Sequence, residues 1–151
     1  RSDGKTYKQA MLETVNLDPE RVHFVGALPY GQYKQVLQAS SVHVYLTRPF
    51  VLSWSLLEAM ACGCVVVGSD TEPVREVIHD GQNGFLTDFF SPKKIAERVA
   101  GVLEYPSFMA PIRRQARQTV LEKYSLKSLL PKQIHSIRNI AGGAAQAPRF
   151  G

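Results

Sequence analysis

The chain has 151 residues, of which 44% are hydrophobic and 21% charged, a balance typical of a soluble globular domain with its own core. No apolar run approaches the roughly 20 residues that a membrane-spanning helix needs. The net charge of +5 is uneven, because residues 113–151 carry eight basic residues and one acid. That segment is either a solvated helix face or a surface near anionic lipid or a phosphorylated ligand. Few aromatic residues interleave with its cations, which disfavours nucleic acid.

Short β-branched runs alternate along the chain with stretches of helical periodicity. Strands are predicted at 21–26, 41–46, 64–68 and 85–87. Helices are predicted at 5–15, 30–40, from about 53 to 61, at 71–78, 91–103, 112–124 and 128–140, the last with Pro131 near its start or at a kink. Strands that alternate with helices indicate an α/β fold with a doubly wound, Rossmann-like parallel sheet. Such sheets bind ligands at the carboxyl ends of their strands, over helix N-termini.

Two cysteines, Cys62 and Cys64, are too few for a disulfide framework, which is consistent with a reducing, cytoplasmic location. The four histidines show no metal-ligand spacing, so we interpret both cysteines as small buried residues beside a strand. The D-x-E pattern at 70–72 is better explained as a loop with a capping acid than as a metal site. We therefore predict neither a metal nor a cofactor.

Glu58 is the one acid in the apolar run "RPFVLSWSLLEAMACG", where a strand gives way to a helix. Two interpretations are open. In the first, Ser55 and Glu58 form a capping box in which the carboxylate bonds back to the cap. In the second, the helix begins earlier with Ser53 as its N-cap, and free amides of Trp54 and Ser55 face an anion. Glu58 would then reach the same crevice and bind a hydroxyl-rich neighbour such as a ribose.

The stretch from Arg21 to Leu103, and above all the combination "LLEAMACG…VV…EVI.DG.NGFL", resembles the C-terminal, donor-binding half of a GT-B glycosyltransferase of retaining family 4. The resemblance implies that Glu58 holds the ribose hydroxyls of a nucleoside-diphosphate sugar of the UDP, GDP or ADP type. It implies that the backbone of Ala27 and Leu28 meets the nucleobase. Amides of the loop–helix junction, at 53–55, would face the diphosphate and sugar.

One departure puts the sugar contacts in doubt. The acid expected eight positions before Glu58 is replaced by Phe50, so no catalytic residue is assigned. Trp54 could replace the lost contacts by stacking, although we favour a role for it as a core anchor. Glu76 matches a frequent family acid, and we favour a surface carboxylate.

The resemblance also implies a strand and a basic phosphate loop that nothing before Arg21 supplies, so we expect an N-terminally incomplete domain at 1–140 and a flexible tail at 141–151. The implied activity is transfer of a glycosyl group to an acceptor hydroxyl with retention, by a protein whose acceptor-binding domain is missing here. This piece would be inactive alone, as part of a cytoplasmic enzyme of polysaccharide biosynthesis. Its basic C-terminal stretch either contacts the missing domain, which we favour, or lies at the inner face of the membrane. A non-catalytic nucleotide- or partner-binding domain is the alternative. A response-regulator-like domain is disfavoured, because "FVGALPY" has no acidic cluster.

Overall fold

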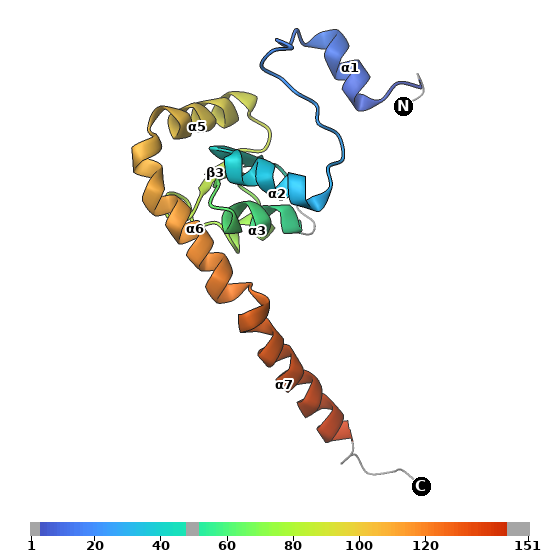
Figure 1. Cartoon of the computed structure of the whole chain (residues 1–151), viewed down its shortest axis with the longest axis vertical. Helices are drawn as coiled ribbons and strands as arrows, with labels where there is room; N and C mark the ends of the chain where they lie inside the picture. Colours follow the sequence, from blue (N-terminus) through green and yellow to red (C-terminus); the bar gives the residue numbers. More distant parts are fainter. Residues whose placement is uncertain (1–3, 48–51, 145–151) are drawn as a thin grey trace. The chain divides into compact units, whose positions relative to one another are not determined.

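The computed structural model describes residues 4–47 and 52–144, with side chains up to residue 141, and the chain divides into two compact units at residue 30 (Figure 1). The first unit contains helix α1 (Tyr7–Thr14), which confirms the helix expected near the start. Its N-terminus is closed by a capping box, in which the Thr6 N–H donates to Gln9 Oε1 at 2.8 Å and the Gln9 N–H donates to Thr6 Oγ1 at 3.2 Å.

The strand predicted at 21–26 is not formed, and this prediction was wrong. Val22, Phe24 and Val25 lie in irregular backbone with exposed side chains. A strand exists only through ladder hydrogen bonds to a neighbour, and within residues 4–47 and 52–144 none is assigned to this segment. Its β-branched composition was therefore not sufficient to make it a strand.

The second unit is built on a three-stranded parallel sheet in the order β1 (Val42–Tyr45), β2 (Val65–Ser69) and β3 (Phe85–Thr87). The register pairs Val42 with Val65 and Val67 with Phe85. The α/β fold with helices around a parallel sheet is thus confirmed, as are three of the four predicted strands.

Helices connect and cover these strands (Figure 1). They are α2 (Tyr30–Ala39), α3 (Trp54–Ala61), α4 (Glu72–Arg75), α5 (Pro92–Glu104), the 3₁₀ turn η1 (Pro106–Phe108), α6 (Met109–Lys123) and α7 (Leu126–Ala144). Helix α5 corresponds to the helix predicted at 91–103. It has Pro92 at its first position, and Ser91 Oγ accepts from the Lys94 N–H at 3.3 Å. In α4 the proline is second, after Glu72.

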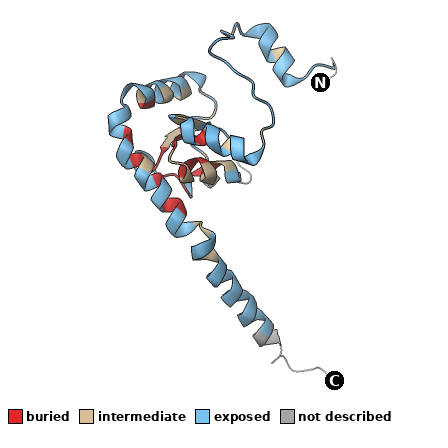
Figure 2. Ribbon diagram, viewed as in Figure 1, coloured by how far each residue is buried: buried red, intermediate tan, exposed pale blue. Residues whose placement is uncertain are grey.

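Strand β2 is buried along its length (Figure 2). Its alternate side chains enter two separate cores. Val66 packs in a cluster with Leu56 of α3, while Val65 and Val67 pack in a second cluster with Val102 of α5. Because successive side chains of a strand point to opposite faces, the continuous apolar run "CVVV" serves a central strand of a doubly wound sheet. Truncation of Leu56 to Ala would cost about 2–5 kcal/mol.

Gly68, at the end of the same apolar run, allows the close approach of α4. A Cβ atom at Gly68 would lie 2.9 Å from Val74 Cγ1 and 3.2 Å from Ile78 Cδ1. Both neighbours are buried, so they have little room to move away. The glycine therefore sets how closely the segment after β2 folds back onto the sheet.

Asn83 is a buried polar side chain that ties the loop before β3 to the rest of the fold. Its Oδ1 accepts from the His79 N–H at 2.7 Å, and its Nδ2 donates to the Val77 carbonyl at 2.9 Å and to Thr119 Oγ1 of α6 at 3.2 Å. All of these bonds are made away from water, where an unsatisfied amide is costly. The "DGQNG" motif thus serves structure through its asparagine.

Helix α7 continues to Ala144, past the helix end predicted at 140, and Pro131 lies inside it. The tail prediction otherwise falls on residues 145–151, outside the described part of the chain. Pro131 has no N–H to donate to the carbonyl four residues earlier, so one bond of the helix is absent there. None of the helices within residues 4–47 and 52–144 combines the length and hydropathy needed to traverse a bilayer.

Candidate donor-binding site

The N-terminus of α3 decides between the two interpretations of Glu58. The N-cap is Ser53, with φ −80° and ψ 145°, and its Oγ accepts from the Ser55 N–H at 3.3 Å. Ser55 is therefore the second residue of the helix and cannot be its cap. The capping-box interpretation was wrong, and the earlier helix start is confirmed. Glu58 is the fifth residue of the helix, about one turn in from its N-terminus.

The position of this cap is set by β1. Tyr45, the last residue of that strand, is buried, and its hydroxyl accepts from the Ser53 N–H at 2.8 Å. At the same edge, the buried Ser69 at the end of β2 donates through Oγ to the Thr47 carbonyl at 3.1 Å and accepts from the Thr47 N–H at 3.2 Å. These contacts fasten the carboxyl ends of two adjacent strands beside the start of α3. Neither residue was predicted from the sequence to have a role here: Tyr45 was an ordinary residue of the strand predicted at 41–46, and Ser69 lay one residue after the strand predicted at 64–68.

The three amides expected to face an anion are not all free. The N–H of Ser53 is bound by Tyr45 and that of Ser55 by the cap, so the expectation that the Ser55 amide is open was wrong. Among the described residues, no hydrogen-bond acceptor is recorded for the N–H of Trp54. Together with the helix dipole, this N–H gives the helix end its remaining capacity to bind an anion.

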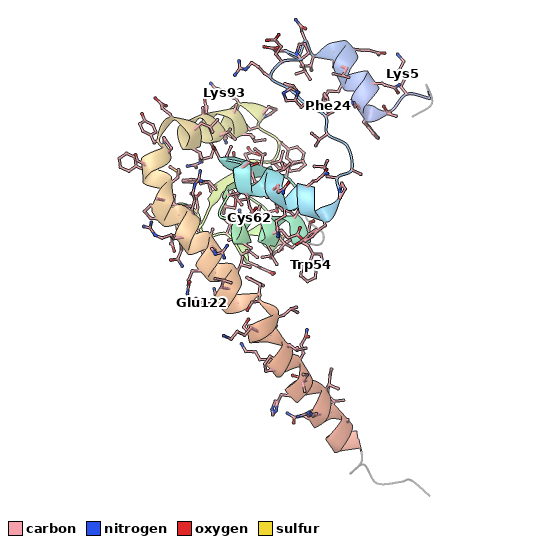
Figure 3. All side chains as sticks on the ribbon, viewed as in Figure 1. Lys5, Phe24, Trp54, Cys62, Lys93 and Glu122 are labelled. Atoms are coloured by element: carbon pink, nitrogen blue, oxygen red, sulfur yellow. The ribbon has the colours of Figure 1, made fainter. Side chains whose placement is uncertain are left out.

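Trp54 is 78% exposed, so its expected role as a core anchor was wrong. Figure 3 shows its side chain at the N-terminal end of α3, directed away from the ribbon. The reason lies in the helix period: Leu56, Ala59 and Met60 are fully buried, and at about 100° per residue they occupy the side of α3 opposite Trp54.

Glu58 shares the outward side of α3 with Trp54, because residues four apart lie about 40° from each other around a helix axis. Its side chain is partly buried. Among the described residues, no hydrogen bond or ion pair engages its carboxylate. Within the described part of the chain, the carboxylate is therefore not bonded to its own cap, and it keeps its capacity to accept hydrogen bonds from a ligand.

The remaining residues that were expected at the site are not among those described so far at the start of α3. Ala27 and Leu28 belong to the first unit, where Ala27 is exposed and Leu28 partly buried. Phe50 lies outside the described residues. Glu76 is exposed at the C-cap of α4, the surface position that we favoured for it.

Asp70, from the D-x-E pattern, forms an ion pair with Arg75, with 2.6 Å between Oδ1 and Nε. The hydrogen bond from Arg75 lowers the pKa of the Asp70 carboxyl. Asp70 therefore braces α4 through Arg75, which lies in the last turn of that helix. Within residues 4–47 and 52–144, no group of three or more potential metal ligands occurs.

The cysteines lie where small residues were expected. Cys64 is buried, its Sγ donates to the Leu37 carbonyl at 2.7 Å, and burial raises the pKa of its thiol. Cys62 is partly buried at the C-cap of α3. A raised thiol pKa lowers the thiolate fraction, so Cys64 acts as a small packing residue.

The basic segment has two different parts. Arg113 and Arg117 of α6 bind protein groups, since Arg113 Nη2 donates to the Ser41 carbonyl at 3.1 Å and Arg117 Nη1 donates to the Ala61 carbonyl at the end of α3. A guanidinium at a helix C-terminus also complements the helix dipole. The basic residues of α7 form the second part, and among the described residues they make no such contact with protein groups.

A cavity of about 760 Å³ lies elsewhere, along β3 and α5, with Phe85, Thr87 and Arg98 among its lining residues. The Arg98 guanidinium stands over the Phe85 ring, 5.3 Å from its centroid. None of the residues predicted to bind the donor lines this cavity. The candidate site at the N-terminus of α3 is therefore separate from this cavity.

Comparison with known proteins agrees with the fold. The family described as "Glycosyl transferases group 1" matches residues 3–119. The chain therefore belongs to this family and has the fold of a GT-B glycosyltransferase C-terminal domain. It is 28% identical over 107 residues to an uncharacterized glycosyltransferase of Methanocaldococcus jannaschii, covering 70% of this chain and 27% of that protein. It is 26% identical over 129 residues to the N-acetyl-alpha-D-glucosaminyl L-malate synthase of Bacillus anthracis, covering 85% of this chain and 33% of the synthase.

Among solved structures, the sucrose-phosphate synthase of Thermosynechococcus elongatus matches with a TM-score of 0.80 at 21% identity, over 90% of this chain and 34% of that one. Anabaena HepE, solved in complex with UDP and glucose, matches with a TM-score of 0.74 at 21% identity, over 80% of this chain and 33% of that one. The chain spans about a third of the length of the proteins that it matches.

Proposed function

We propose that this chain supplies most of the donor-binding half of a retaining glycosyltransferase, which transfers a hexosyl group from a nucleoside-diphosphate sugar to an acceptor hydroxyl. The observation that carries the proposal is the position of Glu58, on the outward side of α3, one turn from the helix end and without a hydrogen-bond or ion-pair partner among the described residues. A carboxylate in that position can accept hydrogen bonds from two ribose hydroxyls.

In this proposal the diphosphate lies at the N-terminus of α3. The Trp54 amide and the helix dipole would stabilise the negative charge that develops on the leaving diphosphate as the glycosidic bond breaks. Glu58 and the N-terminus of α3 would bind different parts of the donor, the ribose and the diphosphate. Glu58 would repel a phosphate placed directly against it, so the ribose must lie between the carboxylate and the diphosphate.

The nucleobase would meet the backbone of Ala27 and Leu28. Solved structures of similar fold that contain UDP or UDP-glucose favour a uridine donor over GDP or ADP types. The acceptor would be bound by a domain outside this chain, a proposal supported by relatives about three times as long. This division of labour implies that the 151-residue chain does not turn over alone. We place the whole protein in the cytoplasm, in polysaccharide biosynthesis.

Helix α7 supports a contact with another part of the protein. Its exposed apolar residues are Leu126, Leu130, Ile134, Ile137 and Ile140. They fall within a stripe about 120° wide, and no acid lies between Lys123 and the end of α7. We favour the acceptor-binding domain as the partner, with peripheral binding to an anionic membrane as the alternative.

Glu58→Gln in the whole protein tests the proposal. We expect nucleotide affinity to fall by about 1–3 kcal/mol, because a charged acceptor is replaced by a neutral amide of similar shape. Glu104→Gln, an exposed acid at the end of α5, is the matched control and should leave affinity unchanged. Product analysis with donor and acceptor must also show transfer with retention by the wild type.

Two outcomes would contradict this function. Equal affinities for wild type and Glu58→Gln would remove the proposed role of the carboxylate. Nucleotide binding without transfer to any acceptor would favour the non-catalytic alternative, a binding domain that has kept the scaffold.

A further inference from the structure

We propose that Trp54 is a specificity determinant of this site, whose indole provides the flat apolar surface against which the transferred sugar of the donor packs. This inference rests on the proposed function, because it takes the ribose to be bound by Glu58. The tryptophan would contact the ligand, in place of the packing role that is usual for a large aromatic residue.

The exposure of Trp54 is the first observation. It is the only tryptophan of the chain and it is 78% exposed at the first position of α3. The rest of that helix follows the expected pattern, since Leu56 and Met60 are fully buried on the opposite side. Leaving an indole in water forgoes about 1.5–3 kcal/mol or more that burial of a large side chain provides. The exposed ring is thus available to cover an apolar face of a ligand.

The second observation is the order of groups along α3. Glu58 lies four residues after Trp54, which is a rise of about 6 Å along the helix axis. Both residues lie on the outward side of the helix. The Cα–Cβ bonds of a helix tilt toward its N-terminus, and the Trp54 side chain lies at that end of α3, directed away from the ribbon (Figure 3).

This order matches that of a nucleoside-diphosphate sugar. With the ribose at Glu58, the diphosphate comes level with the first turn, where the Trp54 N–H has no acceptor within residues 4–47 and 52–144. The sugar follows the diphosphate and therefore meets the indole. One face of a hexopyranose carries mainly C–H groups, which pack on the electron-rich face of an aromatic ring. Trp54 would then bind the donor twice, through its amide and through its ring.

The inference predicts that Trp54 raises the affinity for a nucleotide sugar relative to that for the nucleoside diphosphate without its sugar. The affinity of Trp54→Ala for a nucleotide sugar should fall about tenfold, the size of one lost aromatic contact. Its affinity for the corresponding nucleoside diphosphate should change less than about threefold, because the Trp54 amide remains. Trp54→Phe, which keeps a smaller ring, should lie between wild type and Trp54→Ala.

The experiment uses the 151-residue chain, in which intrinsic tryptophan fluorescence reports on position 54 alone. UDP, GDP and ADP are titrated in parallel with UDP-glucose, GDP-glucose and ADP-glucose, and affinities are measured by calorimetry for wild type and both variants. The control variant is Phe90→Ala, an aromatic residue with a similar exposure of 79% outside α3. We expect the emission of Trp54 to shift more with the nucleotide sugar than with its nucleotide.

The outcomes separate this inference from the proposed function. If a nucleotide sugar binds but Trp54→Ala weakens sugar and nucleotide forms equally, or weakens neither, the role of the indole is refuted and the proposed function stands. If none of the six ligands binds the wild-type chain, the titrations are repeated with the whole protein, and a lack of binding there overturns both. A loss of the sugar's advantage in Trp54→Ala, with the Phe90→Ala variant unchanged, supports the inference.

Discussion

The hydroxyl of Tyr45 accepts a hydrogen bond from the backbone N–H of Ser53 at 2.8 Å, and this contact joins the end of β1 to the N-cap of α3. The tyrosine ring is buried in the core cluster that also contains Leu56 of the same helix. The helix that carries Glu58 is therefore located by the sheet at its start and by the core along its buried side. A donor site at this helix end depends on both.

Tyr45→Phe removes only the hydroxyl and should reveal how much this contact contributes. The ring still fills the core, while the Ser53 N–H loses its acceptor, so we expect a destabilisation of about 0.5–1.5 kcal/mol. Urea unfolding followed by circular dichroism measures this change. Tyr105→Phe, at an exposed ring beside η1, is the matched control and should leave the midpoint unchanged. Equal midpoints for wild type and Tyr45→Phe would show that the contact contributes no net stability.

Substitutions of Ser53 can separate helix stability from anion binding. Ser53→Ala removes the cap that accepts from the Ser55 N–H, and should cost about 1 kcal/mol in unfolding free energy. Ser53→Asp retains a good cap and so retains stability, but its charge should weaken the binding of a nucleoside diphosphate. Denaturation and calorimetric titration of both variants check this pair of results. A Ser53→Asp protein that binds UDP as well as wild type would place the diphosphate elsewhere.

The elements that the sequence predicted correctly are those whose cause is local. The strand before Gly68 is an uninterrupted apolar run, and its burial on both faces needs no knowledge of its neighbours. The segment at 21–26 has a similar composition, but the structure provides no ladder for it. A strand depends on its pairing partner, and a single run of residues does not contain that information.

The candidate site shows the same difference between features with a local cause and features that depend on distant residues. From the sequence alone, Ser53 and Ser55 were both possible as the N-cap, because both fit a capping pattern. In the structure Ser53 is the cap, and its N–H is bound by the hydroxyl of Tyr45, eight residues upstream. Nor could it foresee that Trp54 is exposed, since a large aromatic residue at a helical position is usually packed. Glu58 was singled out because a lone carboxylate in an apolar run is a local signal, and its role as a ribose ligand stays a prediction.

The stability of the fold should depend on pH through His43 of β1. Burial lowers the pKa of this imidazole below its ordinary value near 6.5, so below that pH the unfolded chain binds more protons than the folded one. The stabilisation is complete above about pH 6.5 and is lost as pH falls through the lower, folded-state pKa. Urea midpoints measured between about pH 5 and pH 8 should decrease toward acid.

A neutral side chain at the same position should remove this dependence. His43→Gln is expected to flatten the acid side of the profile, whereas His79→Gln, at an exposed histidine in the loop before β3, should reproduce the wild-type profile. If the His43→Gln profile falls as steeply as that of wild type, another group causes the loss of stability in acid.

Helix α7 should be covered by another domain when the whole protein is present. In the 151-residue chain its residues 131–141 are exposed, and the hydrogen bonds of an uncovered helix open readily to solvent. We therefore expect amide hydrogen exchange in α7 to be fast in this chain and slower in the whole protein. Ile137→Asp, on the apolar stripe, should restore fast exchange, because a charge there cannot be buried without a partner. Lys132→Asp, on the polar side, is the control. Should α7 exchange equally fast in both proteins yet bind phosphatidylserine vesicles and not phosphatidylcholine vesicles, its apolar stripe would be a membrane contact.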